Sequence, residues 1–408
     1  MKRLLFALAL QTVCGQGAAQ YYTTLDSQTG IRMFSKVVPR REIVLPKIDG
    51  YTLYKADFHT HTIYSDGDVT PRERVREAWY DGLDIIAITD HLEIRTYEKF
   101  MLKALAPYSK DGEPFVYQHA GIANKEDKTA PVLSNLNASY DEAVYYAQRE
   151  GLPIMVVRGT EIWRNPEQVG EYNALFLSDI NAICHHDLIE SFRRVKAQGG
   201  IIQHNHPGWS RQSMEMGNEE QIRAYEEGWI DGVEVINSST LYPTIARRCA
   251  ERGLYMAANT DAHHPTAQVW GADKEFFRTM TFVMAKQCTE ESIKEALLKR
   301  RTICYSGNNL VAEESLLCKF LNAAVECKVV AEDKKKGQRT YCLTNSCSIP
   351  FLLRKGGSVY ILKPFTSQSF TLGKDKQSGK YLLPRFTVDN MWHLDEQHPV
   401  IEIAVDKR

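Results

Sequence analysis

The sequence has 408 residues, of which 43% are hydrophobic and 25% are charged, and its formal net charge is −1. This composition is typical of a globular protein, and the length exceeds what one ordinary core supports, so we expect two domains. A chain so close to neutrality offers no electrostatic case for binding nucleic acid or an anionic membrane, and neither is expected as a partner.

Residues 1–19 have the pattern of a secretory signal peptide. Lys2 and Arg3 precede an apolar run, Leu4–Leu10, and small residues then lead to Ala19. We therefore expect cleavage after Ala19, an N-terminal lead-in over residues 20–50, and export to the periplasm or the extracellular space. The apolar run is too short to span a bilayer, and no later stretch approaches the ~20 apolar residues that a span needs.

From about residue 51 to residue 309 the sequence alternates between strand-like and helix-like segments. Short apolar, β-branched runs predict seven strands, at Leu53–His59, Ile85–Thr89, Ile154–Ile162, Tyr172–Leu177, Gly200–His204, Gly232–Ile236 and Leu254–Asn259. Amphipathic runs predict five helices, at Pro71–Tyr80, Tyr140–Glu150, Leu188–Gln198, Glu219–Glu227 and Thr244–Glu251. Strands in series with helices between them predict an α/β fold with a parallel sheet that is closed or nearly closed into a barrel.

Two stretches break this alternation. Residues from about 99 to 137 lack a clean periodicity, which indicates a long insertion on the side where such barrels keep their sites. From about residue 310 the alternation stops, and Phe351–Leu362 has the pattern of a hairpin around a Gly-Gly turn. Further short strands are expected at Phe370–Leu372, Tyr381–Leu383 and Val400–Val405. Residues 310–408 are therefore predicted to form a small, sandwich-like β domain.

The cysteines permit disulfides without requiring them. Nine cysteines become eight if Cys14 leaves with the signal peptide, and four of these fall in the last hundred residues: Cys318, Cys327, Cys342 and Cys347. An even number in an exported protein allows a bridge there, and buried thiols are the alternative.

The first sign of chemistry is the pair His59 and His61. Side chains at i and i+2 of a strand point to the same face, so the two imidazoles are aimed into one space. Asp66 follows in the next turn, and together the three residues supply half of a metal site.

Other ligand-type residues lie at the ends of four of the remaining strands. His91 comes after the second strand, Glu161 ends the third, His206 follows the fifth, and Asp261 and His263 follow the seventh. In a parallel barrel these ends meet at one rim. A buried histidine is more often a satisfied core residue, but so many imidazoles and carboxylates together would cost several kcal/mol of desolvation without a cation. The ligand types suit two or three divalent ions of Mn, Fe or Zn.

The motifs HxHTxxSDG, TDH, G-x-E, HPG and D-A-H occur in this order between Tyr51 and Ser306. Together they resemble those of the polymerase and histidinol phosphatase (PHP) family of metal-dependent phosphoesterases. With its appended β domain, the chain looks like the secreted phosphodiesterase branch. The resemblance implies a distorted (β/α)7 barrel with a trinuclear metal centre.

The resemblance also implies a role for each ligand. His59, His61 and Asp261 would hold one ion, and Glu161 would bridge to a second. His206 would join the second ion, and the third would be held by Asp66, His91 and His263.

One position departs from the family pattern. The family often has a histidine ligand some way beyond the bridging glutamate, where this chain has Glu171. Glu171 could ligate in its place and bias that ion toward Mn or Fe, or it could support the ligands from outside in a weaker or binuclear site. His185 and His186 are lower-ranked candidates because they lie past the strand.

A hydrolase of phosphate esters, either diesters or monoesters, follows from this interpretation. A metal-bridging hydroxide would attack phosphorus. Arg95 and Arg211 are candidate phosphate clamps, and a surface arginine in a loop is the alternative for each. His204 or His264 could protonate the leaving group or orient a ligand.

Two alternatives of other kinds remain open. One is a metal-dependent hydrolase of C–N bonds or carboxyl esters. The other is a non-catalytic protein that binds metal or carbohydrate. The leading expectation is an exported hydrolase acting on the ester bonds of a small-molecule phosphate ester.

Overall fold

The computed structural model describes residues 40–96, 135–163, 170–209, 211–270, 276–394 and 396–406. The chain divides into two compact units, residues 1–41 and residues 42–408, and the second holds every element given below. The expected signal peptide, the part of the lead-in before residue 40, and the insertion as far as residue 134 lie outside the described residues.

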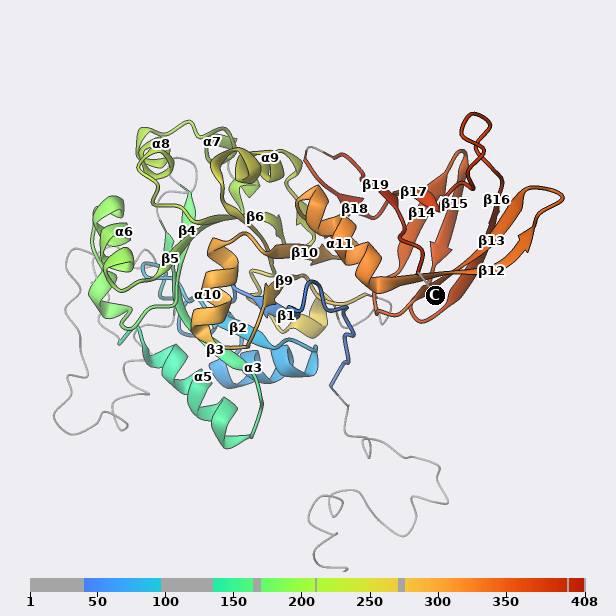
Figure 1. The fold of residues 1–408 in the computed structure, drawn as a ribbon. Coiled ribbons are helices and arrows are strands. Elements are labelled where there is room, and N and C mark those ends of the chain that lie inside the picture. The colour runs from blue at the N-terminus through green and yellow to red at the C-terminus, as the bar shows by residue number, and fades with distance from the viewer. Residues whose placement is uncertain are drawn as a thin grey trace, which may run out of the picture. The chain divides into compact units, whose positions relative to one another are not determined.

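All seven expected strands are present, with no end shifted by more than two residues. They are β1 (Thr52–Asp57), β2 (Ile85–Ile88), β3 (Met155–Trp163), β4 (Glu171–Leu175), β5 (Ile201–Asn205), β6 (Gly232–Asn237) and β8 (Tyr255–Asn259). The expected helices are also present, as α3 (Pro71–Tyr80), α5 (Ala138–Arg149), α6 (Leu188–Ala197), α8 (Glu219–Glu226) and α9 (Pro243–Arg252) (Figure 1). The predicted α/β barrel followed by a β domain is thus confirmed.

Short elements and the rest of the chain complete the fold. Around the barrel lie η2 (Asn181–Ile183), η3 (Pro207–Trp209), α7 (Arg211–Glu215), β7 (Thr240–Leu241), η4 (Thr266–Gln268), β9 (Met280–Ala285), α10 (Glu290–Leu298), β10 (Thr302–Ser306), β11 (Asn309–Val311) and α11 (Glu314–Ala324). The C-terminal strands are β12 (Val325–Asp333), β13 (Gln338–Asn345), β14 (Phe351–Lys355), β15 (Ser358–Leu362), β16 (Ser367–Leu372), β17 (Arg385–Val388), β18 (Met391–Trp392) and β19 (Val400–Glu402).

The barrel sheet is not wholly parallel, which corrects the expectation. The pairs β1–β2, β2–β3, β5–β6 and β6–β8 are parallel, but β4 runs antiparallel to both β3 and β5. Residues 164–170 connect β3 to β4, and this connection is shorter than the dozen or more residues that a parallel crossover needs. The start of β4 therefore lies at the same rim as the ends of its two neighbours.

The ring closes through backbone bonds just beyond β1 and β8. Thr60 and Ala262 form a parallel bridge, the Asp261 N–H donates to the His59 carbonyl at 2.9 Å, and the His61 N–H donates to the Ala262 carbonyl at 3.0 Å. On its other side β1 pairs antiparallel with β9, and the sheet continues through β10, β11 and β18.

Local sequence explains how the helix after the first motif begins and which face it buries. Thr70 caps α3 by accepting from the Glu73 N–H, and Pro71 occupies the first turn, where its missing N–H costs nothing. Val75 and Ala78 on one face of α3 are fully buried and belong to the same core as Ile86 of β2.

The C-terminal strands form two small sheets, ordered β12-β13-β16 and β15-β14-β17-β19. The expected hairpin is present as β14 and β15, whereas the strand expected at Tyr381–Leu383 is reduced to a single bridge between Lys374 and Tyr381. None of the eight described cysteines forms a disulfide, so the thiol alternative holds in this structure.

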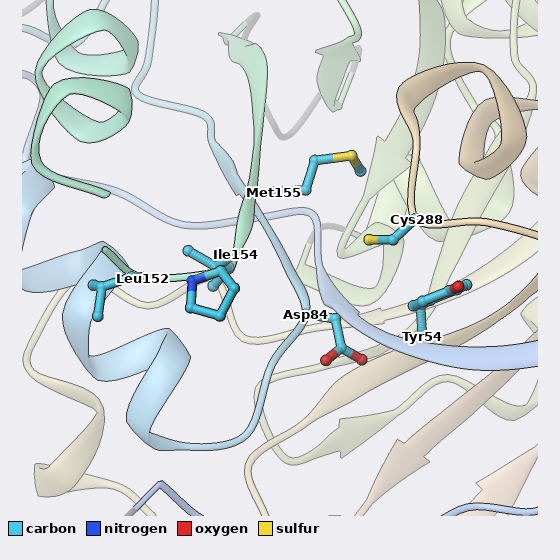
Figure 2. Close-up of a pocket in the computed structure, with 7 residues that line it drawn as sticks. Tyr54, Asp84, Leu152, Ile154, Met155 and Cys288 are labelled. Carbon is cyan, nitrogen blue, oxygen red and sulfur yellow. The ribbon is translucent and has the colours of Figure 1, made fainter. Parts of the chain in front are cut away.

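A hollow of about 470 Å³ lies where β1, β2 and β3 begin, away from the rim formed by their ends. Figure 2 shows its lining, which consists of Tyr54, Asp84, Leu152, Pro153, Ile154, Met155 and Cys288. Its one carboxylate, on Asp84, pairs with Lys55 at 2.7 Å, and none of the predicted ligands lines it. Within the described ranges, no helix has the length and apolar character needed to cross a bilayer.

Candidate metal centre

The rim at the ends of β1, β3, β5 and β8 gathers the predicted ligands. Eight of them form two sets in which one ligand atom from each residue lies within 4.8 Å of the others. The Glu161 group comprises His59, Glu161, His206 and Asp261. The Asp66 group comprises His61, Asp66, His91 and His263. His61 thus falls with the predicted third ion's ligands, although its Nε2 also lies 3.1 Å from Asp261 Oδ1.

The histidine pair points into the barrel, as its spacing predicts. The two Nε2 atoms lie 3.1 Å apart, and both side chains are fully buried. Between them, Thr60 turns away and donates its hydroxyl to the Ala87 carbonyl at 2.7 Å. The alternation along the extended chain therefore aims both imidazoles at one space.

Glu161 lies at the centre of the cluster. Its Oε2 is 3.2 Å from His59 Nε2, 3.2 Å from His61 Nε2 and 3.3 Å from His91 Nδ1. Its Oε1 is 3.4 Å from His206 Nε2 and accepts from Asn205 Nδ2 at 2.6 Å. One carboxylate thus touches both groups, an arrangement suited to bridging two ions.

The Asp66 group is built on the tight loop after β1. Asp66 lies 3.5 Å from His91 Nε2 and 3.4 Å from His263 Nε2. Asp90 holds the loop by accepting from the Thr62 N–H and from the Ser65 hydroxyl, both at 2.7 Å. The next residue, Gly67, has no space for a side chain, because a Cβ there would lie 2.8 Å from backbone atoms of His61 and Thr62.

The antiparallel course of β4 explains why Glu171 joins the cluster although it begins a strand. Glu171 pairs with Trp163 and Asn205, the last residues of β3 and β5, and its Oε2 lies 3.0 Å from His206 Nε2. Burial, together with the charge of Glu161, raises the pKa of Glu171 to about 8.

Opposite charges hold the cluster together in the metal-free chain. Burial alone would lower the pKa values of His61 and His206, but neighbouring carboxylates outweigh it and raise them to about 10 and about 9. Burial likewise opposes ionisation of Glu161 and Asp261, but the surrounding histidines hold their pKa values well below the usual range. His91 differs, since burial dominates and lowers its pKa to about 4.

Three buried polar atoms of the cluster test whether the residues fit metal ions. Asp66 Oδ1, His91 Nδ1 and Asp261 Oδ1 make no hydrogen bond within the described part of the chain. Leaving such atoms unsatisfied costs about 1–3 kcal/mol each, more for charged groups, and native proteins rarely do so. Because all three belong to residues of the two groups, and imidazole with carboxylate suits Mn, Fe or Zn, the residues fit divalent ions.

His204 belongs to neither ligand group, and its role as a proton donor or as a residue that orients a ligand stays a prediction. Its neighbours on β5, Gln203 and Asn205, contact acidic residues inside the barrel, so His204 faces outward. There its ring stacks on Tyr172 with centroids 4.9 Å apart, and its Nδ1 bonds the Tyr225 hydroxyl at 2.6 Å.

The other candidates lie outside both groups. Arg211 is an exposed residue of α7 paired with Glu215 at 3.2 Å, whereas Arg95 is buried and donates to the His91 carbonyl at 3.1 Å. The His264 side chain is 61% exposed and bonds Asp68. The phosphate and proton-transfer roles of these three residues stay predictions.

The remaining alternatives for the ligand position beyond Glu161 were His185 and His186. Their rings pack on each other with centroids 4.2 Å apart, between η2 and α6. Neither belongs to a ligand group among the described residues.

Sequence reasoning missed the buried groups that hold the ligands. Asp90 is the middle residue of the TDH motif and Asn205 precedes the HPG motif, and their position next to a ligand was the available signal. Glu234 contacts His59 from the middle of β6, where a lone carboxylate in the run Gly232–Asn237 was the only sign.

Comparison with known proteins agrees with this site. The PHP domain family matches residues 57–258. A solved two-domain protein from Bacteroides vulgatus, described as containing a predicted PHP-like metal-dependent phosphoesterase, is 30% identical, with a TM-score of 0.73 over 91% of this chain and 100% of that one.

A second relative adds a match over part of the chain. An uncharacterized protein of Methanocaldococcus jannaschii is 29% identical over 140 residues, which are 33% of this chain and 59% of the relative, so the match spans less than two thirds of that relative's length. With the solved two-domain protein matched over its whole length and the ligand motifs gathered at one rim, the chain belongs to the PHP-domain family of metal-dependent phosphoesterases.

Proposed function

We propose that this protein is an exported hydrolase of small-molecule phosphate esters that works with two or three divalent ions of Mn, Fe or Zn. The observation that carries the proposal is the position of Glu161, whose side chain is 1% exposed and lies within 3.4 Å of four histidines. A buried carboxylate shared in this way suits ions that act together on one phosphoryl group.

The chain's own residues would hold the ions and shield most of the ligand atoms from water. His59, His206 and Asp261, with Glu171 beside them, would hold an ion on one side of Glu161, and the Asp66 group would hold an ion on the other. Ions bound there would lower the pKa of a coordinated water and neutralise the charge on the phosphate oxygens. The barrel wall keeps His59, His61, Glu161 and His206 out of bulk water, whereas Asp66 and His263 are partly exposed.

The proposal is tested by turnover of model esters. The protein is stripped with a chelator, reloaded with Mn, Fe or Zn, and assayed with bis-p-nitrophenyl phosphate, p-nitrophenyl phosphate and a p-nitrophenyl carboxylate. We expect metal-dependent release of p-nitrophenol from at least one phosphate ester, and the ratio of the two rates distinguishes a diesterase from a monoesterase. Turnover of the carboxylate alone, or of nothing under any metal, would sink the proposal.

The substrate class needs its own comparison. The net charge of −1 supports a small ester rather than a polyanionic strand. A single-stranded oligonucleotide assayed beside the model esters should therefore be cleaved far more slowly than they are. If the oligonucleotide is cleaved faster than the model esters, the proposal of a small-molecule substrate is wrong.

Export rests on the signal-peptide pattern of residues 1–19. The full chain is expressed in a bacterial host, and the intact mass and N-terminal sequence of the product in the periplasm or medium are determined. We expect a product that begins at Gln20. A cytoplasmic product that retains Met1–Ala19 would count against export.

A further inference from the structure

Glu234 is a fully buried carboxylate that the ligand motifs do not include. It lies in the middle of β6, and its side chain points into the barrel toward His59. Each of its two oxygens accepts two hydrogen bonds of 2.9 Å or less. Every donor of these four bonds is an imidazole, a backbone N–H or a carboxamide.

The first oxygen orients a metal ligand. Oε1 lies 2.9 Å from His59 Nδ1 and accepts from Asn259 Nδ2, also at 2.9 Å. A carboxylate can only accept, so this contact places a proton on Nδ1 and leaves the lone pair on Nε2. That Nε2 is the atom that lies 3.2 Å from both Glu161 and Asp261.

The second oxygen holds the backbone of another ligand. Oε2 accepts from the His206 N–H at 2.7 Å and from Asn237 Nδ2 at 2.9 Å. His206 has a φ of 21°, a strained value for a residue with a side chain. This backbone turns the imidazole toward Glu161 and Glu171, so the bond to Glu234 secures a conformation that the chain would otherwise relax.

We propose that Glu234 is the positioning residue of the Glu161 group, acting on His59 through its ring and on His206 through its backbone. A carboxylate, a histidine and a metal ion in line form a common unit that fixes the tautomer and strengthens the ligand. Because none of these four bonds reaches a residue of the Asp66 group, the effect of Glu234 is confined to the ion of the Glu161 group.

The test is metal binding by Glu234→Gln, with Asp231→Asn as the matched control. Asp231 is a largely buried carboxylate directly before the same strand, where it accepts from the Ile202 N–H at 2.7 Å and pairs with Lys196. Elemental analysis and competitive titration with Mn and Zn measure the number and affinity of the ions. We expect Glu234→Gln to bind one ion about 10- to 100-fold more weakly, with the other ions unchanged. Asp231→Asn should bind all of them as wild type does.

Equal affinity in Glu234→Gln and wild type would overturn the proposal, as would equal weakening of every ion. A general loss of structure would lower the thermal midpoint of both variants without this selectivity. If Glu234→Gln does not fold, nitrogen NMR of zinc-loaded wild type, labelled at histidine, takes its place. His59 should then be protonated at Nδ1 and bound through Nε2, and binding through Nδ1 would contradict the proposal.

The inference rests on the metal-holding part of the proposed function. If the loaded protein hydrolyses no phosphate ester but Glu234→Gln still weakens one ion selectively, the phosphoesterase proposal fails and the role of Glu234 stands. If wild type binds no divalent ion, both fail.

Discussion

At the scale of single residues, the cluster depends on side chains that serve both ligand groups. Glu161 contacts three histidines through one oxygen and His206 through the other. Glu171 approaches His206 alone among the four histidines around Glu161. The two carboxylates should therefore differ in how much of the centre each one supports.

Glu161→Gln should remove at least one ion and reduce turnover at least about a hundredfold. A carboxamide carries no charge and offers one oxygen instead of two, so it cannot bridge ions. Elemental analysis of the purified variant gives the ion count. Glu190→Gln is the control, because Glu190 is a partly exposed partner of Arg193 and belongs to neither ligand group, and it should keep full metal content. Full metal content in Glu161→Gln would contradict the bridging role.

Glu171→His should shift the metal preference from Mn or Fe toward Zn. An imidazole nitrogen in place of a carboxylate oxygen raises the relative affinity for zinc. Stripped wild type and variant are each loaded from an equimolar mixture of Mn and Zn, and the bound ratio is measured. An unchanged ratio and ion count would show that Glu171 does not ligate.

Metal binding should release protons, and the affinity should rise with pH. His61 and His206, with pKa values raised to about 10 and about 9, are protonated at pH 7 in the metal-free chain and must lose a proton to offer a lone pair. Calorimetry in buffers of different ionisation enthalpy counts the protons released. No proton release at pH 7 would contradict this account.

The same raised pKa values should make the metal-free protein less stable as the pH rises, whereas the metal affinity increases. A histidine whose folded pKa is raised stabilises the fold fully below its unfolded value of 6.5, and this contribution is lost as pH rises through the folded pKa. The thermal midpoint of the stripped chain should therefore fall between about pH 7 and pH 10.

At the scale of elements, loops and strand directions place the ligands. The loop after β1 brings Asp66 toward His91 and His263, and the reversal at β4 brings Glu171 to the rim. The positions of Asp66 and Glu171 therefore depend on how the backbone packs rather than on the ligand side chains themselves.

Gly67→Ala should disturb the Asp66 group selectively. The new Cβ would meet the backbone of His61 and Thr62 at 2.8 Å, so the loop must shift, at a cost of about 1–3 kcal/mol. Denaturant unfolding measures this cost. Metal titration should show weaker binding of the ion of the Asp66 group, which is not the ion affected by Glu234→Gln. Gly357→Ala, where no atom lies within 4 Å of the Cβ, should change neither measurement. Equal results for the two glycines would contradict the packing argument.

At the scale of the whole molecule, the barrel and the C-terminal β sheets share one apolar core within residues 42–408. Ile86 and Phe282 of the barrel belong to the same buried cluster as Phe320, Phe351 and Val388. β18 also pairs with β11, so a strand from the C-terminal region completes the edge of the barrel sheet.

Removal of residues 310–408 should therefore destabilise the barrel rather than release an intact enzyme. The truncation would expose the apolar surface that α11 and β14 cover. Exposing it costs about 25 cal/mol of folding free energy per Å². The full chain should unfold in a single thermal transition, and the shortened chain should show no cooperative transition. A soluble shortened chain with full metal content and its own sharp transition would contradict this expectation.

Much of the fold and of the ligand set could be predicted from the sequence because local rules govern them. Alternation along a strand predicts that His59 and His61 share a face, and the end of each apolar run predicts where His91, Glu161 and Asp261 fall. Periodicity and capping predict the helices α3, α5, α6, α8 and α9.

Tertiary structure alone decided the rest. The direction of β4, and with it the place of Glu171, follows from a connection too short for a crossover. His204 and His206 are two apart and would share a face on a regular strand, but the backbone turn at His206 separates them. Glu234 is distant in sequence from His59, and no local pattern reports such a contact. The sequence by itself determined which residues could ligate, and the tertiary structure decided which of them meet, because convergence depends on strand direction and packing between distant segments.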